Sequence, residues 1–300
     1  MIKKKLKGYS LFDFVNTALV ILITFILAYP LYFCIIASVS NPSEVTLGHT
    51  LLWVKGFDLT GYKRILNEDQ VWIGYRNTIF YTVAGTLYNL ALTIPAAYVM
   101  SKNKMHFHGI ISWYFFITMY IGGGMIPSYL LVKNLGLINT PWVMIIGSGV
   151  SCYNMIITRQ YFSTSIHPDI YEAAEIDGAG QGACFVKIAM PLAKPIMAVM
   201  ALYYGVGHWN SYMGALLYIY KKNLYPLQLV LRNVLINSQL NFSDLESLSV
   251  EDVEMALYKS QLAQTMKYGI IIVSSIPLIM IYPFMQKYFV KGVMIGSVKG

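Results

Sequence analysis

The hydrophobic positions of this chain gather into long apolar runs, separated by shorter polar stretches. A helix that crosses a membrane needs about 20 consecutive, predominantly apolar residues. Runs of that kind predict six transmembrane helices, so the expected fold class is an all-α membrane protein. A basic tail at residues 1–14 is expected to precede the first of these helices. The predicted spans are 15–37, 78–100, 110–132, 142–158, 195–218 and 267–289.

One polar stretch between the fourth and fifth spans has the pattern of two helices and a turn. Pro168 is suited to the first turn of a helix, where its missing N–H costs nothing. Gly178 and Gly180 favour an end to that helix and a change of direction. A second helix is predicted over 181–189, with Pro191 at its end. The stretch 167–191 is therefore expected to form a helix–turn–helix.

The composition agrees with a membrane protein. Hydrophobic residues make up 56% of the chain and charged residues 12%, whereas soluble domains have about 25% charged residues. The net charge of +8 does not indicate nucleic-acid binding, because the basic residues lie at the ends of spans. Since basic loops stay inside, both termini and the helix–turn–helix are expected in the cytoplasm, and 219–266 outside. A cleaved signal peptide is the alternative for the first span, but its apolar run exceeds the usual signal core of about 7–15 residues.

Polar side chains recur at helical spacing in the last two spans. Such side chains face a partner or an aqueous path, because an unpaired polar group in hydrocarbon is costly. They have two interpretations: hydrogen bonds between helices, or a path in which aromatic rings and amides accompany a sugar. The candidates for that path are Tyr204, His208, Trp209, Asn210, Tyr212, Tyr268 and Ser275.

The chain lacks the motifs of common enzymes. There is no phosphate-binding loop, nucleophile elbow or HExxH pair, no metal site is predicted, and the three cysteines imply no disulfide framework. The centres of the spans are almost free of Asp, Glu, Lys and Arg, so a proton or ion relay is not expected. No enzymatic activity is therefore expected of this chain, and if it moves a solute uphill, the energy must come from another polypeptide.

The run from Glu172-Ala173-Ala174 through Gly178 to Ile188 and Met190-Pro191 resembles the EAA loop of the membrane subunits of bacterial ABC importers. The usual Leu-Pro is here Met190-Pro191. The ending 286–300, Trp209-Asn210 and Pro226-Leu227-Gln228 resemble the smaller permease of the maltose-type, carbohydrate-uptake class.

This resemblance implies a type I importer permease fold over 15–300 and a carbohydrate, in particular an oligosaccharide, as the substrate. It implies a second related permease, two nucleotide-binding ATPase subunits that bind ATP and Mg, and an extracytoplasmic solute-binding protein as partners in a bacterial plasma membrane. No cofactor is expected on this chain itself. The residues implied in coupling to the ATPase are Glu172, Ala173, Ala174, Asp177, Gly178, Pro191, Ser297, Lys299 and Gly300, and those implied in contact with the binding protein are Lys221, Lys222 and Gln228.

Two alternatives stay open at this point. The importer could carry another solute, such as glycerol phosphate or a polyamine. The chain could also be a passive channel or a membrane enzyme, which would function without an ATPase.

Overall fold

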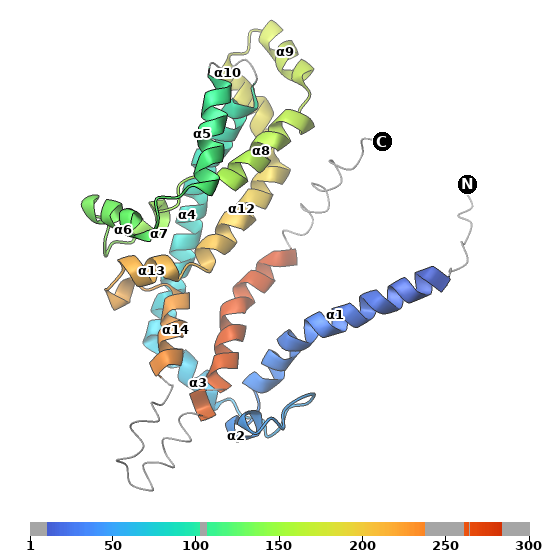
Figure 1. The fold of residues 1–300 in the computed structure, drawn as a ribbon, viewed down its shortest axis with the longest axis vertical. Helices are drawn as coiled ribbons and strands as arrows, with labels where there is room; N and C mark the ends of the chain where they lie inside the picture. The colour runs from blue at the N-terminus through green and yellow to red at the C-terminus, as the bar shows by residue number, and fades with distance from the viewer. Residues whose placement is uncertain (1–10, 103–106, 238–260, 264, 284–300) are drawn as a thin grey trace. The chain divides into compact units, whose positions relative to one another are not determined.

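The computed structural model describes residues 11–102, 107–237, 261–263 and 265–283, and these residues are predominantly helical (Figure 1). The chain divides into two compact units. The first unit contains residues 1–68 and 234–275, and the second contains 69–233 and 276–300.

The first unit is built on the long helix α1, Leu11–Ser38. The short helices α2, Pro42–Thr46, and α3, Thr60–Leu66, follow it, and most of the helix Gln261–Pro283 belongs to the same unit. The ring of Phe33 meets that of Tyr268 edge to face, with centroids 5.5 Å apart. The hydroxyl of Tyr62 donates to Ser38 Oγ over 2.9 Å.

The second unit is centred on α4, Asp69–Ser101, which packs mainly against α8 and α12. The remaining elements follow in chain order: α5 His108–Tyr120, α6 Met125–Asn134, α7 Trp142–Ile146, α8 Cys152–Ser165, α9 Pro168–Ile176, α10 Gln181–Ala183, the π-helix η1 Cys184–Ala189, α11 Met190–Leu192, α12 Lys194–Trp209, α13 Met213–Tyr218, the 3₁₀-helix η2 Lys222–Leu224 and α14 Leu227–Asn237, which extends past the boundary of the unit.

The helices agree with the predicted spans in part. Within the part of the chain that the structure describes, three helices are long and apolar enough to cross a membrane: α1, α4 and Gln261–Pro283. Among the described residues the number rises to five if each bent pair of helices counts as one span. The total of six spans therefore stays a prediction. Helix α4 contains the predicted span 78–100 but begins at Asp69.

Three of the predicted spans are not continuous helices. In 110–132, α5 ends at Tyr120, and α6 leaves at 112° after the glycines 122–124. In 142–158, residues 147–151 separate α7 from α8, and Ser151 caps α8 by accepting from the N–H of Asn154. In 195–218, α12 ends at Trp209 and α13 starts at Met213. An apolar run predicts membrane depth, but clustered Gly, Ser and Asn residues decide where a helix stops.

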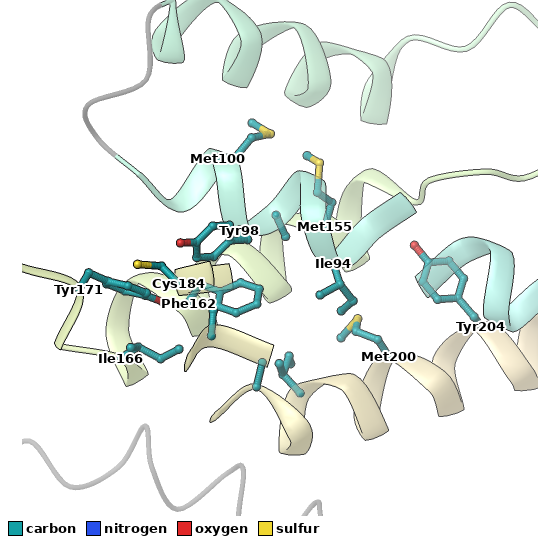
Figure 2. Packing of buried hydrophobic residues seen from close by; sticks show 14 residues of the cluster. Ile94, Tyr98, Met100, Met155, Phe162, Ile166, Tyr171, Cys184, Met200 and Tyr204 are labelled. Atoms are coloured by element: carbon teal, nitrogen blue, oxygen red, sulfur yellow. The ribbon is translucent and has the colours of Figure 1, made fainter. Parts of the chain in front are cut away.

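A buried cluster joins the ends of α4, α8 and α12 to the predicted helix–turn–helix (Figure 2). Tyr98 of α4 lies at its centre, with ring centroids 5.6 Å from Phe162, 6.0 Å from Tyr171 and 4.9 Å from Phe185. Aromatic pairs of this kind contribute about 0.5–1.5 kcal/mol each beyond their buried area. The cluster therefore fixes the helix–turn–helix to the helical bundle.

Candidate functional site

Helix α9 begins and ends as its sequence predicts. Pro168 occupies its first turn, and His167 caps the same end by accepting from the N–H of Asp169 over 3.5 Å. After Ile176 the chain turns through Gly178, whose φ of +82° lies in the left-handed region. A residue with a Cβ is strained in this conformation, so the turn requires glycine here. Gly180, with a φ of −69°, has no such requirement.

The second helix of the motif runs further than expected. It passes through α10, η1 and α11 to Leu192, so Pro191 does not end it. Pro191 has no N–H to donate to the preceding turn, and that turn has the wide π form, in which the usual hydrogen-bond spacing is already changed. The chain then bends by 76° into α12. Gln181 Nε2 donates to Glu175 Oε1 over 2.8 Å and joins the two helices of the motif.

Tyr171 attaches α9 to the bundle. Its side chain is buried beside Tyr98, and the ammonium group of Lys102, at the end of α4, lies 3.0 Å from the centroid of its ring. Burial raises the pKa of the Tyr171 hydroxyl to about 12, and Tyr98 and Cys184 act in the same direction. The sequence prediction missed both Tyr171 and Lys102, because their contact joins residues far apart in the chain.

The opposite face of α9 is exposed. Glu172, Ala173 and Asp177 lie on the surface, as a docking surface requires. Ala174 differs from the prediction, because it packs against the buried cluster and leaves Ala173 as the alanine available to a partner. Ile176 is 86% exposed, although the sequence prediction did not include it. An isoleucine among acidic residues was the signal in the sequence that could have identified it.

A cavity of about 660 Å³ lies behind this helix. It is lined by Tyr98, Lys102 and Phe162 on one side and by Tyr171, Glu172 and Glu175 of α9 on the other. Glu172 and Glu175 therefore border this cavity as well as the exposed surface.

Two of the path candidates form a polar network between α12 and α4. Asn89 donates through Nδ2 to the carbonyls of Ser148 and Gly149, the latter over 2.7 Å. Its Oδ1 must then be the acceptor for His208 Nε2, 2.7 Å away. Tyr204 lies 2.7 Å from Thr93 Oγ1 and accepts from the N–H of Ser151 over 3.1 Å.

This network agrees with hydrogen bonding between helices, the first of the two interpretations. The sequence prediction missed Gly85, on which a Cβ would overlap the His208 ring. Glycine is therefore required at that position for α4 and α12 to approach each other.

Tyr204 and His208 also line a cavity of about 360 Å³, which bears on the second interpretation, a path for a sugar. Tyr204 and His208 share its wall with Ser148, Ser151 and Asn154. The helical spacing of the path candidates holds only as far as Trp209, where α12 ends, so Tyr212 lies beyond this helix. Trp209 is buried with its ring 6.3 Å from that of Tyr75, and Asn210 accepts from Gln228 Nε2 over 3.5 Å.

Tyr268 and Ser275 belong to the first unit, and both are half-buried. A path lined by the polar side chains of both of the last two predicted spans therefore stays a prediction.

The segment 219–226 is held firmly by polar side chains from elsewhere in its unit. Asn77 donates to the carbonyls of Asn223 and Tyr225 over 2.8 and 3.0 Å, and Tyr81 donates to that of Leu224 over 2.9 Å. Asn139 Oδ1 accepts from the N–H groups of Tyr220 and Lys221 over 3.0 and 2.9 Å. The side chains of Lys221 and Lys222 stay exposed, while Gln228 is half-buried. The segment thus presents two lysines on an ordered backbone.

Three coupling candidates, Ser297, Lys299 and Gly300, lie outside the described residues. Within the described part of the chain, no group of three His, Cys, Asp or Glu residues could hold a metal ion. All three cysteines are free thiols.

The chain matches known proteins over most of its length. Residues 71–295 match the family described as binding-protein-dependent transport system inner membrane component. Protein LplC of Bacillus subtilis is 35% identical over 90% of this chain and 89% of its own length. The polygalacturonan/rhamnogalacturonan transport system permease protein YtcP of the same organism is 33% identical, with coverage of 97% and 99%.

A solved structure is similar as well. It belongs to a bacterial ABC transporter involved in the import of the acidic polysaccharide alginate. The likeness has a TM-score of 0.82 at 32% identity and covers 94% of this chain and 99% of the other.

Proposed function

The chain belongs to the binding-protein-dependent transport system inner membrane components, and from this premise we infer that it is the permease subunit of an ATP-driven sugar importer. It is a transport subunit and not an enzyme. Its relatives include a transport permease for polygalacturonan and rhamnogalacturonan, and a similar structure serves alginate import. The substrate we propose is accordingly an oligosaccharide, with fragments of acidic polysaccharides as the first compounds to test.

The observation that carries the proposal is the two-sided character of α9. One side is fixed to the bundle through Tyr171, and the other exposes Glu172, Ala173 and Ile176. When a protein docked on the exposed side moves this short helix, the contacts on its buried side transmit the movement to α4, α8 and α12. The docked protein in the proposal is a nucleotide-binding ATPase, and this subunit holds the ATP and Mg.

The proposed assembly contains one copy of this chain, a second related permease, two ATPases and an extracytoplasmic binding protein. Both termini face the cytoplasm of a bacterial cell, as the distribution of basic residues supports. Lys221 and Lys222 are exposed on the segment 219–226, which we propose faces outward, and these two lysines are proposed to contact the binding protein. Ser297, Lys299 and Gly300 are proposed as further contacts with the ATPase.

The cavity beside Tyr204 and His208 supports passage of a sugar. Its lining offers tyrosine rings for the apolar faces of pyranose rings, and it offers hydroxyl and amide groups for sugar hydroxyls. The same groups also bind helices together, so the path in this proposal is built from the helix interface itself.

The complete importer in proteoliposomes, with its binding protein outside and ATP inside, tests the function. We expect ATP-dependent uptake of a labelled oligosaccharide, and loss of uptake in Glu172→Lys with ATP hydrolysis no longer stimulated by the loaded binding protein. Glu172→Gln, which keeps the size of the side chain, is the matched control and should retain most of the uptake. Uptake without an ATPase would instead indicate a channel, and uptake confined to glycerol phosphate or polyamines would contradict the sugar assignment.

A further inference from the structure

The loop that follows α2 folds back along α1 (Figure 1). Two tyrosines of α1 hold it there through its backbone. The hydroxyl of Tyr29 donates to the carbonyl of Leu51 over 3.1 Å, and the hydroxyl of Tyr32 donates to the carbonyl of Leu52. The loop is therefore fixed beside the helix and not beyond its end.

The position of these tyrosines sets the depth of the loop. Helix α1 ends at Ser38. At 1.5 Å per residue, the backbone of Tyr32 lies about 9 Å, and that of Tyr29 about 13 Å, before this end. Side chains of a helix lean toward its N-terminus, which takes the two hydroxyls further from Ser38. The depth of the two hydroxyls in the membrane does not depend on which side of the membrane Ser38 faces. From Ser38, the helix runs toward its N-terminus into the membrane in both cases.

The uncharged part of α1 converts this position into a membrane depth. It runs from Phe14 to Ser38 and spans about 38 Å, which exceeds the ~30 Å hydrocarbon core by about 4 Å at each end. Ser38 then lies in the headgroup region. Because the two tyrosine hydroxyls lie further toward the bilayer centre, the carbonyls of Leu51 and Leu52 reach the boundary between headgroups and acyl chains.

The side chains of the loop suit that boundary. Leu51, Leu52 and Trp53 are 57%, 61% and 76% exposed. Three consecutive large apolar side chains are unfavourable in water, whereas tryptophan is enriched where headgroups meet acyl chains. The two tyrosine hydroxyls satisfy carbonyls that would lack water there, which is the requirement for irregular backbone at membrane depth.

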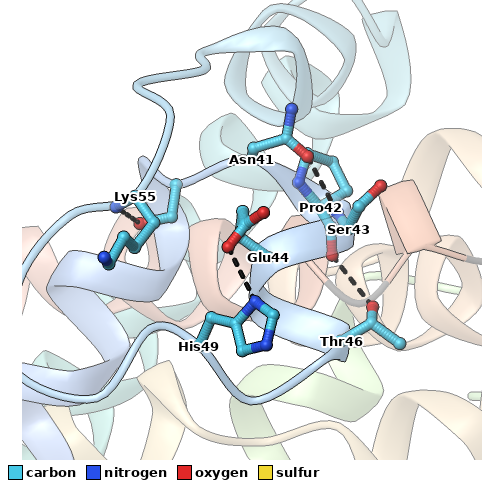
Figure 3. Close-up of polar contacts among 8 residues, drawn as sticks. Asn41, Pro42, Ser43, Glu44, Thr46, His49 and Lys55 are labelled. Atoms are coloured by element: carbon cyan, nitrogen blue, oxygen red, sulfur yellow. Dashed lines mark hydrogen bonds and ion pairs between the residues drawn. The ribbon is translucent and has the colours of Figure 1, made fainter.

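Hydrogen bonds hold the base of the loop to the residues that follow α1 (Figure 3). The N–H of Lys55 donates to Ser40 Oγ over 3.2 Å, and the N–H of Asn41 donates to the carbonyl of Lys55 over 2.9 Å. The exposed pair of His49 and Glu44, 3.0 Å apart, is associated with α2. The exposed polar residue His49 thus precedes the apolar tip by two positions in the chain.

We propose that Leu51, Leu52 and Trp53 form a lipid anchor, which inserts among phospholipids at the headgroup–acyl boundary and is held by Tyr29 and Tyr32. The occupant of this surface is the membrane leaflet itself. The anchor fixes the first unit in depth, independently of the substrate that the importer carries.

An environment-sensitive fluorophore tests the anchor in the assembled importer in nanodiscs. The three native cysteines are replaced by serine, and NBD is attached through Trp53→Cys, through Leu52→Cys as a second site, or through His49→Cys as the control. Retained uptake confirms that each variant folds. We expect blue-shifted emission at positions 52 and 53, quenching by lipids with spin-labelled acyl chains and protection from aqueous iodide. The label at position 49 should show the reverse.

Two results would overturn the anchor. Iodide quenching at 52 and 53 equal to that at 49 would place the tip in water. Blue-shifted emission without quenching by spin-labelled lipid would place it against the partner permease. The double variant Tyr29→Phe/Tyr32→Phe should reduce lipid quenching at 53, while Tyr62→Phe, whose hydroxyl bonds Ser38, should not. Equal quenching in both would contradict the role of the two tyrosines.

Discussion

The ammonium group of Lys102 lies 3.0 Å from the centroid of the Tyr171 ring and 5.0 Å from that of Tyr98. A cation over an aromatic face contributes about 0.5–2 kcal/mol, more when water is excluded. This contact joins the end of α4 to the helix that we propose as the docking site of the ATPase. Movement of α9 must either carry α4 with it or break this contact.

Tyr171 should act through its ring and not through its hydroxyl. The hydroxyl is buried and finds no hydrogen-bond partner within the described residues. Tyr171→Phe should leave stability unchanged or slightly higher, because it removes an unsatisfied polar atom. Tyr171→Ala should lower stability by about 3–5 kcal/mol and uncouple ATP hydrolysis from uptake. Thermal unfolding of the purified importer measures both, and a larger loss in Tyr171→Phe than in Tyr171→Ala would refute the interpretation.

The raised pKa of Tyr171 predicts a pH dependence. The pKa is about 12 in the folded protein, against 10.0 for an ordinary tyrosine. A group with a raised folded pKa binds its proton more tightly in the folded state. Its contribution to stability is thus fully present below pH 10 and is lost as the pH rises toward 12. Tyr171→Phe should flatten this part of the stability profile, and an unchanged profile would speak against burial as the cause.

The turn at Gly178 predicts a pair of contrasting variants. Gly178→Ala forces a Cβ into the left-handed region, at a cost of about 1–2 kcal/mol. We expect it to shift α9 and reduce stimulated ATP hydrolysis and uptake together. Gly180→Ala has an ordinary φ and open space around the added Cβ, so it serves as the control. Equal activity in the two variants would show that the turn does not matter for coupling.

The close approach of α4 to α12 predicts a second pair. Gly85→Ala would drive a methyl group into the His208 ring, which should cost about 1–3 kcal/mol through overpacking. Gly205→Ala lies on α12 with ordinary contact distances of 3.7 Å or more, and it should gain up to about 1 kcal/mol of helix stability. Melting temperatures of the two variants that move in the same direction would contradict the close packing of α4 on α12 at Gly85.

The hydrogen bonds of Asn139 predict an effect of this residue on the segment 219–226. Its side chain holds the backbone of Tyr220 and Lys221, so Asn139→Ala should loosen 219–226 and weaken stimulation of ATP hydrolysis by the binding protein. Asn139→Asp keeps the acceptor oxygen and should preserve most of that stimulation. Titration of the binding protein against ATP hydrolysis distinguishes the two, and identical curves would remove this segment from the proposed contact.

Local signals in the sequence predicted local structure. Pro168 and Gly178 determine the bounds of α9 through their own backbone preferences, so neighbouring residues sufficed to place them. The fit of Gly85 to His208 and the hold of Asn139 on Tyr220 depend on residues far apart in the chain. The apolar pattern also could not predict that α5 and α8 would be short, because a broken helix and a continuous one bury similar side chains in the membrane. The packing of Ala174 against the buried cluster could not be predicted for a related reason, since composition does not reveal which side of a helix faces its own core.

Helix α4 has 33 residues and is therefore about 50 Å long. Asn77 and Tyr81, about 12 and 18 Å from its N-terminal end, hold the segment 219–226 with its two exposed lysines, and Tyr98 and Lys102 hold α9 at its C-terminal end. Because both segments are attached to one helix, movement of one segment is transmitted to the other. The two attachments are about 30 Å apart along the helix, so a tilt of a few degrees imposed at α9 displaces the segment 219–226 by about 2–3 Å. In our proposal, a loaded binding protein that docks on this segment moves α9 through the same helix in the opposite direction.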